Sequence, residues 1–367
     1  MTKCTARQVR TQAGFGIIEI MIALLLGIFI MLGVTEIATK NSRTSYELEN
    51  VGRQIENATS ALRLLEGEMT NAAFWGERRA VDVSSMPPLC PAAACDQVVI
   101  PLLDDPSCEL NWAMGYPVQG GRATIAQPDF SCPTADDTGD TDLITPKIGT
   151  DYVAIRRASS CAVGDPGCAP GDTSFHLQVD ACFKSLTPED TERVKISSTY
   201  VSDLADFDYR NRDCGTLEYA PIYRFISRIY YVNDDDQLIR AELDSDAEDT
   251  FEYTETPLVD NVEVLRLEYG LDTSGDGQED APVDPLDPYP TIANDTRWSN
   301  VIRITISMVV RSGKPSAGFQ EEKVYTVAGE TYCAAGCDVT IPAEFVRHRR
   351  QLYTRTVSLR NVAGRRW

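Results

Sequence analysis

The chain has 367 residues, enough for roughly two or three domains, and 43% of them are hydrophobic, which is sufficient for a buried core. Its 55 acidic and 34 basic side chains give a formal net charge of −21. This acidity argues against general nucleic-acid binding, which needs clustered lysine and arginine, and leaves room only for a small basic patch. The only histidines are His176 and His348, so multi-histidine zinc sites are excluded. A serine–histidine–aspartate hydrolase would have to use one of these two residues.

The beginning of the chain combines a basic leader with a long apolar segment. Residues 1–14 contain lysine and arginine but no acid, and residues 15–38 are apolar apart from Glu19, Thr35 and Glu36. A helix over 15–38 is about 36 Å long, which is enough to cross a bilayer. Because positive charge precedes the segment, we expect the N-terminus in the cytoplasm and the rest of the chain outside.

An ordinary secretory signal fits this segment poorly, because its apolar region would be only about 7–15 residues long and would end at a small-x-small site. A plain membrane anchor does not explain Glu19, since a carboxylate in a lipid-facing helix costs roughly 2.5–3.5 kcal/mol on insertion scales. The acid therefore indicates a partner or a functional role.

Residues 14–19 read Gly-Phe-Gly-Ile-Ile-Glu and stand between the basic leader and the apolar helix. This arrangement resembles the class III signal of type IV pilins. The resemblance implies that prepilin peptidase cuts after Gly14 and that the new N-terminal residue, Phe15, is N-methylated. Glu19 is then the fifth residue of the mature chain and can neutralise the N-terminal amine of a neighbouring subunit during assembly. Two costly buried charges would become one hydrogen-bonded pair.

Residues 39–73 are predicted to continue the helix in amphipathic form, since there is no proline between Phe15 and Ser85. Apolar side chains recur at steps of three and four residues, as expected for one buried face of a helix. These positions are Leu48, Val51, Ile55, Ala58, Leu62, Leu65, Met69 and Ala72. We expect this face to pack on the core of a globular head, in preference to an intermolecular coiled coil.

Residues 74–217 are rich in cysteine, proline, glycine and aspartate, and short apolar runs there predict strands between long loops. Outside the leader the chain has ten cysteines: Cys90, Cys95, Cys108, Cys132, Cys161, Cys168, Cys182, Cys214, Cys333 and Cys337. An even number outside the membrane predicts up to five disulfides, although the sequence does not fix their connectivity. We expect the near pairs 90/95, 161/168 and 333/337, which leaves 108/132 and 182/214. A cysteine zinc site is the competing interpretation, but the paired C-x₂-C spacing is missing.

Residues 218–367 are predicted to form the antiparallel sheet of the head. The runs 223–232 and 238–243 flank the polar turn 233–236, which predicts a hairpin. Apolar residues alternate with polar ones in 265–269 and 302–308, as in half-buried strands. The expected fold class is α+β, with a long N-terminal helix packed on an antiparallel sheet and a cysteine-rich loop insertion.

This order of elements resembles the PilW family of minor type IV pilins. The local resemblance lies in residues 228–232, 269–272, 310–312 and 359–361, whereas 74–217 shows none. It implies a pilin-like fold and a subunit that primes assembly of type IV pili or caps them, in support of twitching motility, adhesion or DNA uptake. The implied partners are prepilin peptidase, other minor pilins, the major pilin and the inner-membrane assembly platform. The implied location is the inner membrane with a periplasmic head, and then the pilus tip or cell surface.

One acidic loop has the donor spacing of a calcium site. Asp272, Ser274, Asp276 and Asp280 occupy positions 1, 3, 5 and 9 of such a loop, with glycine at position 6 and the Gln278 carbonyl at position 7. The expected glutamate at position 12 is replaced by valine, and Asp284 follows one residue late. Ca²⁺ could bind there in a loop between strands, and the alternative is a solvated acidic turn.

Two other functions are compatible with parts of this sequence. A type II secretion pseudopilin of the J kind shares the signal and the fold, and a membrane-anchored periplasmic binding protein would not polymerise. No nucleophile, paired carboxylate or cofactor motif is found, so we expect no enzyme. The C-terminus from Arg347 onward is locally basic, and we expect it to pair with carboxylates of a neighbouring subunit.

Overall fold

The computed structural model describes residues 14, 16–76, 116–123, 146–168, 174–182, 194–197, 207–215, 218–245, 251–280 and 296–363. By contact density the chain divides into two units, residues 1–52 and 53–367. Helix α1, Ile17–Asn71, begins in the first unit and ends in the second. Residues 1–13 of the leader, Phe15 and most of the segment between 77 and 145 lie outside the described residues.

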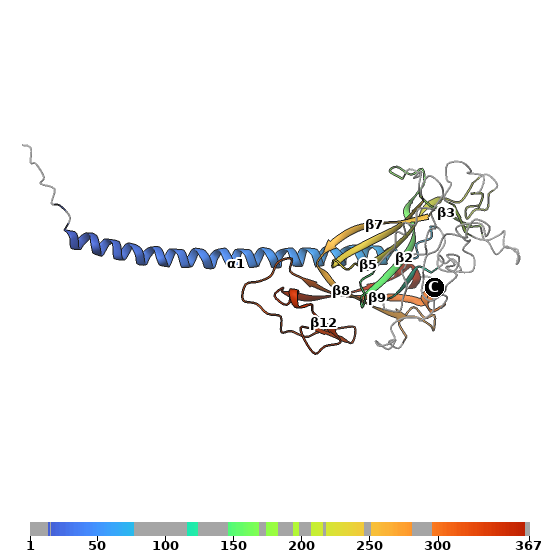
Figure 1. Ribbon diagram of the computed structural model, residues 1–367. Coiled ribbons are helices and arrows are strands. Elements are labelled where there is room, and N and C mark those ends of the chain that lie inside the picture. Colours follow the sequence, from blue (N-terminus) through green and yellow to red (C-terminus); the bar gives the residue numbers. More distant parts are fainter. Residues whose placement is uncertain are drawn as a thin grey trace, which may run out of the picture. The chain divides into compact units, whose positions relative to one another are not determined.

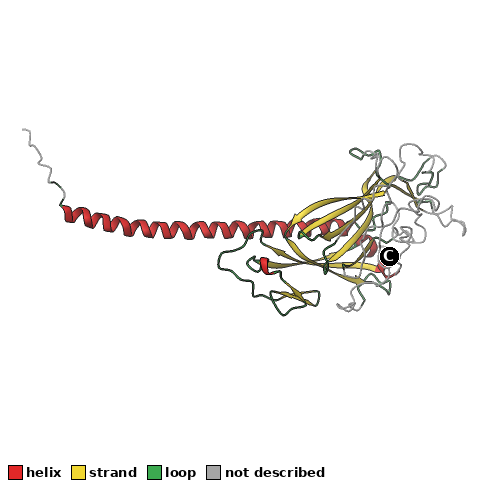
Figure 2. Cartoon of the chain, in the orientation of Figure 1, coloured by secondary structure: helices red, strands yellow, loops and turns green. Residues whose placement is uncertain are grey.

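The second unit is a β-rich head (Figures 1 and 2). Its strands are β1 (Val118–Arg122), β2 (Asp151–Ala162), β3 (His176–Val179), β4 (Val194–Ser197), β5 (Ile222–Val232), β6 (Gln237–Ser245), β7 (Phe251–Asp260), β8 (Val262–Leu271), β9 (Val301–Arg311), β10 (Tyr325–Val327), β11 (Glu330–Cys333), β12 (Val339–Thr340) and β13 (Arg350–Ser358). Two 3-10 helices, η3 (Thr296–Asn300) and η4 (Ala343–Phe345), and the short helix α3 (Arg360–Ala363) complete the described elements. The α+β class expected from the sequence agrees with this content.

The strands form three sheets, whereas the sequence led us to expect one sheet over 218–367. Strands β1 to β7 make a seven-stranded antiparallel sheet, in which β2, β3 and β6 all pair with the long strand β5. Strands β8, β9 and β13 make a second antiparallel sheet in the order β13-β9-β8. A small sheet of β10, β11 and β12 is the third, with β11 and β12 parallel. The second half of the chain is therefore shared between sheets.

The predicted hairpin is confirmed as β5 and β6. Its turn is closed by the amide of Asn233, which donates to the carbonyl of Gln237 at 3.0 Å. Asp236 takes a positive φ of 59° in this turn. Aspartate tolerates the left-handed region better than most residues, so the local sequence supports the turn.

The main core lies between the second part of α1, the seven-stranded sheet and the β13-β9-β8 sheet. Along the helix the fully buried apolar residues are Ala58, Ala61, Leu65 and Met69, and Ala72 follows directly after its last residue. Their steps of three and four residues place them on one helical face, and all of them except Ala61 belong to the positions that the sequence pattern predicts. Burying such a face stabilises a helix more than its intrinsic propensity does.

The predicted helical face differs from the structure in its first part. Leu48 and Ile55 are 68% and 46% exposed, and Gln54, which the pattern did not include, is buried. The side-chain amide of Gln54 donates to the carbonyl of Val310 at 2.6 Å, at the end of β9. A buried polar group is tolerated where it is hydrogen-bonded, so this contact explains why the amide replaces the expected isoleucine.

Candidate functional site

The first turn of α1 carries the predicted assembly residue. Glu19 is the acidic residue of this turn and is exposed, as is Gly14 before it. A carboxylate near a helix N-terminus interacts favourably with the helix dipole. The predicted processing residue Phe15 lies outside the described residues.

Around Glu19 the helix surface is apolar and uncovered. The large apolar side chains from Ile17 to Ile37 are between 51% and 80% exposed. Among the described residues, α1 is the one helix that is long and apolar enough to cross a membrane. So much exposed apolar surface is stable only where lipid or another protein covers it.

The predicted calcium loop uses its carboxylates to hold its own backbone. Asp280 accepts hydrogen bonds from the hydroxyl of Thr273 and from the amide of Ser274 at 2.9 Å. These bonds, first of all the one from the Thr273 hydroxyl, lower the pKa of Asp280. Asp272 accepts from the amides of Gly275 and Gly277 at 2.6 and 2.9 Å.

The remaining predicted calcium ligands do not complete a cluster in the structure. Asp276 accepts from the amide of Gln278 at 2.8 Å, and the hydroxyl of Ser274 lies 3.4 Å from Asp272. Asp284 lies outside the described residues. Within the described ranges, no group of three histidine, cysteine, aspartate or glutamate residues is placed to hold a metal ion. Ca²⁺ binding at this loop therefore stays a prediction.

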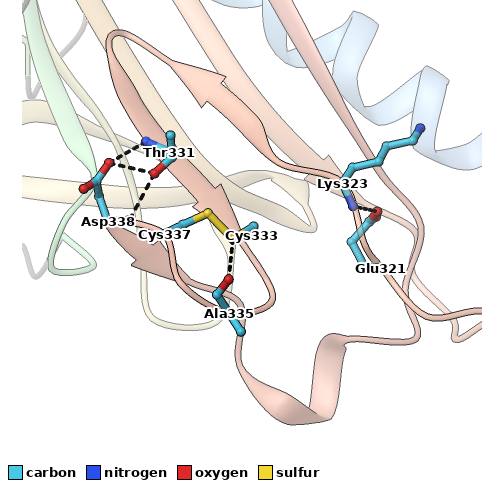
Figure 3. The surroundings of a disulfide bond; sticks show 7 residues. All are labelled: Glu321, Lys323, Thr331, Cys333, Ala335, Cys337 and Asp338. Atoms are coloured by element: carbon cyan, nitrogen blue, oxygen red, sulfur yellow. Dashed lines mark hydrogen bonds between the residues drawn. A yellow bond between two sulfur atoms is a disulfide. The ribbon is translucent and has the colours of Figure 1, made fainter.

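Three disulfides are present in the described part of the head: Cys161–Cys168, Cys182–Cys214 and Cys333–Cys337. These are the same pairs that we expect from the sequence. The other candidate cysteines, Cys90, Cys95, Cys108 and Cys132, lie outside the described residues. The Cys333–Cys337 bond closes the loop between β11 and β12, where the amide and hydroxyl of Thr331 both donate to Asp338 at 2.8 Å (Figure 3).

Both histidines are buried in the head. Burial, with the nearby positive charge of Arg224, lowers the pKa of His176 to about 4. Burial also lowers the pKa of His348, whose Nδ1 lies 2.7 Å from the carbonyl of Ser312. Buried and neutral histidines of this kind are typical of a packed core. The expectation that the chain is not an enzyme stays a prediction.

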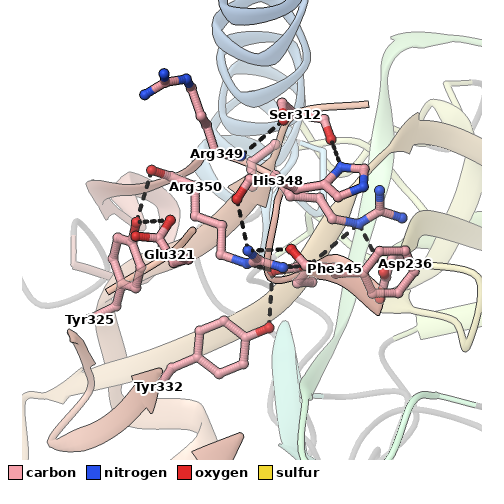
Figure 4. Close-up of polar contacts among 12 residues, drawn as sticks. Asp236, Ser312, Glu321, Tyr325, Tyr332, Phe345, His348, Arg349 and Arg350 are labelled. Carbon is pink, nitrogen blue, oxygen red and sulfur yellow. Dashed lines mark hydrogen bonds and ion pairs between the residues drawn. The ribbon is translucent and has the colours of Figure 1, made fainter. Parts of the chain in front are cut away.

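A buried ion cluster around Glu263 connects all three sheets, and Figure 4 labels its members Asp236, Tyr332 and Arg350. Glu263 on β8 binds Arg350 on β13 through two contacts of 2.6 and 2.7 Å. It also accepts a hydrogen bond of 2.9 Å from the hydroxyl of Tyr332 on β11. Arg311 on β9 lies 3.4 Å from Glu263 and 3.3 Å from Asp236 in the turn between β5 and β6. Charge pairing and hydrogen bonds therefore offset the cost of burying these groups.

A second cluster around Asp151 makes the same kind of connection. Asp151 on β2 is fully buried and accepts a hydrogen bond of 2.8 Å from the backbone amide of Leu267 on β8. Arg122 on β1 binds both Asp151 and Glu330 on β11, and Arg266 lies 2.7 Å from Glu330. Burial alone would raise the pKa of Glu330, but the hydrogen bond and charge of Arg266 outweigh it and lower the pKa.

The helix is joined to the seven-stranded sheet by a third set of charges. Glu68 on α1 lies 2.6 Å from Arg228 on β5 and 3.3 Å from Arg157 on β2. Arg228 also contacts Glu242 on β6 at 3.0 Å. These contacts fix the orientation of the last turns of α1 on the sheet, where a purely apolar face would allow sliding.

Comparison with known families is informative for the part of the head that contains these clusters. Residues 229–361, from β5 to α3, match the family model of PilW, type IV pilus-assembly protein W. The chain carries a PilW region. This match confirms the predicted resemblance to the PilW family and indicates a general role in type IV pilus assembly. Comparison with curated proteins and with solved structures gave no match.

The PilW region contains both sheet-connecting acids of the C-terminal half, Glu263 and Glu330, together with their arginine partners Arg266, Arg311 and Arg350. The sequence pattern did not reveal these ion clusters. The signal available was weak, because Arg266 occupies a polar position of an alternating strand and such positions normally face solvent. Helix α1, Ile17–Asn71, lies outside the PilW match.

Proposed function

We propose that this chain is a membrane-inserted minor pilin that helps to prime or cap type IV pili. The observation that carries the proposal is the presence, on one chain, of the Gly14–Glu19 signal, a membrane-length apolar helix and a PilW region. The signal supports membership of the pilin superfamily, and the PilW match supports the pilus over type II secretion. The head would lie in the periplasm before assembly and on the pilus afterwards.

In this proposal prepilin peptidase cuts after Gly14, and the new amine of Phe15 is methylated. The helix surface around Glu19 is apolar and exposed, so in the membrane an unpaired carboxylate there is costly. The amine of a neighbouring subunit would supply the missing counter-charge as that subunit enters the fibre. The ion pair would favour assembly without requiring any enzymatic activity of this chain.

Helix α1 carries both the proposed assembly residue and the residues that anchor the head. Glu19 stands at one end of α1, and Leu65 and Met69 are buried in the head near the other end. The helix has 55 residues, which corresponds to a nominal length of about 80 Å. The proposed function therefore divides the helix into an assembly segment and a segment that anchors the head.

A matched pair of variants tests the proposal. We expect Glu19→Ala to reduce the amount of this chain in sheared surface fibres at least tenfold, because the counter-charge for the incoming amine is lost. Glu36→Ala is the control, since Glu36 lies in the same helix but pairs with Lys40 at 2.7 Å on the helix surface. Immunoblots of sheared fibres and of membranes measure both variants.

Mass spectrometry of the mature chain provides the independent measurement. We expect an N-terminus at Phe15 that carries one methyl group. A functional chain that still begins at Met1 would refute the proposal, as would normal incorporation of the Glu19→Ala variant into fibres.

A further inference from the structure

Strand β13 forms one edge of the β13-β9-β8 sheet. Its register with β9 is unbroken from the pair Arg350–Arg311 to the pair Ser358–Arg303. The opposite edge, β8, is covered, since its residue Leu267 donates a backbone hydrogen bond to Asp151 of the seven-stranded sheet. The β13 edge is therefore the accessible edge of this sheet.

The hydrogen bonds at the two ends of β13 show which of its residues turn their amides and carbonyls toward β9. The amide of Ser312 donates to the carbonyl of Arg349, and the amide of Leu359 donates to the carbonyl of Ile302, both at 2.8 Å. In an antiparallel pair, every second residue exchanges hydrogen bonds with the partner strand. The odd-numbered residues of β13 therefore face β9, and the even-numbered residues direct their amides and carbonyls away from it.

Four successive even positions consequently present an unpaired row of backbone groups: Leu352, Thr354, Thr356 and Ser358. Among the described strands, β13 pairs with β9 alone, and none of the backbone hydrogen bonds outside the helices and sheets involves these outward groups. Such a row is a template for pairing with another strand, and proteins usually protect it. The edge strand β7 shows one such protection, since it contains Pro257. Strand β13 contains no proline.

The charges around β13 indicate the chemistry of its partner. From Phe345 to Trp367 the sequence contains seven arginines and no acidic residue, although the whole chain has a net charge of −21. Two of these arginines are already paired within the head, Arg350 with Glu263 and Arg355 with Glu66. Arg347 and Arg360, just beyond the two ends of β13, are exposed and form no ion pair within the described ranges. An acidic segment alongside β13 would be attracted by both.

We propose that the open edge of β13 binds an extended, carboxylate-bearing segment of another protein, which adds to the sheet as a fourth strand. Backbone pairing requires donors and acceptors in alternation, which the outward amides and carbonyls supply. A phosphate backbone offers only acceptors and would leave the outward carbonyls unmatched. The edge therefore favours a polypeptide over nucleic acid. This inference does not depend on the proposed pilin function.

A photo-crosslinking amino acid at position 356 of the full chain, expressed in the cell envelope, tests the proposal. We expect cross-links to a protein segment that carries aspartate or glutamate, identified by mass spectrometry of the cross-linked peptide. In this background Thr354→Pro should lower the cross-link yield at least fivefold, because proline removes an outward amide without breaking the pairing with β9. Thr354→Val is the matched control, since it also loses the hydroxyl contact with Ser307 but keeps the amide.

A charge variant gives a second measurement, which decides the question if thermal unfolding shows that the proline variant is not folded. We expect reversal of both flanking charges, Arg347→Glu with Arg360→Glu, to lower the same cross-link at least threefold. Four outcomes would overturn the proposal: no protein cross-link; cross-links only to lipid or nucleic acid; cross-links only to β13 of a second copy; or equal loss in the proline and valine variants.

Discussion

His176 is a fully buried base in β3 whose ionisation opposes folding. Its pKa is about 4 in the folded head, against a normal value of 6.5. Between these values the unfolded chain binds the extra proton and the folded chain does not, so acidification favours unfolding. The stability linked to His176 is complete above about pH 6.5 and falls as the pH drops towards 4.

We expect the free energy of unfolding to decrease over this pH range by as much as about 3 kcal/mol, since one pKa unit corresponds to about 1.4 kcal/mol. His176→Gln should reduce the slope of the free energy of unfolding against pH, because glutamine does not titrate in this pH range. Urea denaturation at pH 7, 6, 5 and 4 measures this slope for both proteins. Some slope should remain in the variant, because burial also lowers the pKa of His348. An identical slope in both proteins would contradict the claim that the lowered pKa of His176 contributes to this pH dependence.

The disulfides differ in how much chain they constrain. The sequence separation is 32 residues for Cys182–Cys214, 7 for Cys161–Cys168 and 4 for Cys333–Cys337. In the loop-entropy model, closing a longer loop removes more entropy from the unfolded chain. The bond between residues 182 and 214 should therefore stabilise the head most.

We expect Cys182→Ala with Cys214→Ala to cost about 3.7 kcal/mol, against about 2 kcal/mol for Cys333→Ala with Cys337→Ala. Calorimetric melting of the two double variants measures the difference. The comparison is useful because both pairs lie in the same head and both variants are measured against the same parent protein. A greater loss for the shorter loop would indicate that native packing, rather than chain entropy, controls the effect.

Elements with local signals could be predicted from the sequence. The helical face that contains Leu65 and Met69, the hairpin turn 233–236 and the alternating strand 302–308 all depend on residues close together in the chain. Local periodicity and turn chemistry are sufficient for such elements. The division into three sheets was not predictable in this way, because it depends on contacts such as Asp151 with Leu267, which are 116 residues apart.

In the candidate site, too, local sequence patterns identify single residues but not contacts between distant segments. The sequence pattern was sufficient to single out Glu19, because its acid stands alone in an apolar segment. By contrast, Arg266 occupies a polar position of an alternating strand, yet it is only 2% exposed because Glu330 of the small sheet pairs with it. Periodicity reports which side of a strand is polar, but not whether a later segment covers that side.

The head as a whole is held together by charges as well as by its apolar core. Through Glu263 and Asp151, the two buried clusters link the seven-stranded sheet, the β13-β9-β8 sheet and the small sheet. Removing one partner from such a cluster leaves another charge buried without compensation. We therefore expect the three sheets of the head to unfold together, as one cooperative unit.

Glu263→Gln tests this coupling against an exposed pair in the same head. The substitution leaves the guanidinium of Arg350 buried without its carboxylate, so we expect a loss of about 3–5 kcal/mol in the free energy of unfolding. Glu66→Gln is the control, because the pair of Glu66 with Arg355 is largely exposed and should contribute less than about 1 kcal/mol. Chemical denaturation, followed by tryptophan fluorescence and by circular dichroism, measures both variants. Similar costs for the two substitutions would show that the buried cluster does not couple the sheets.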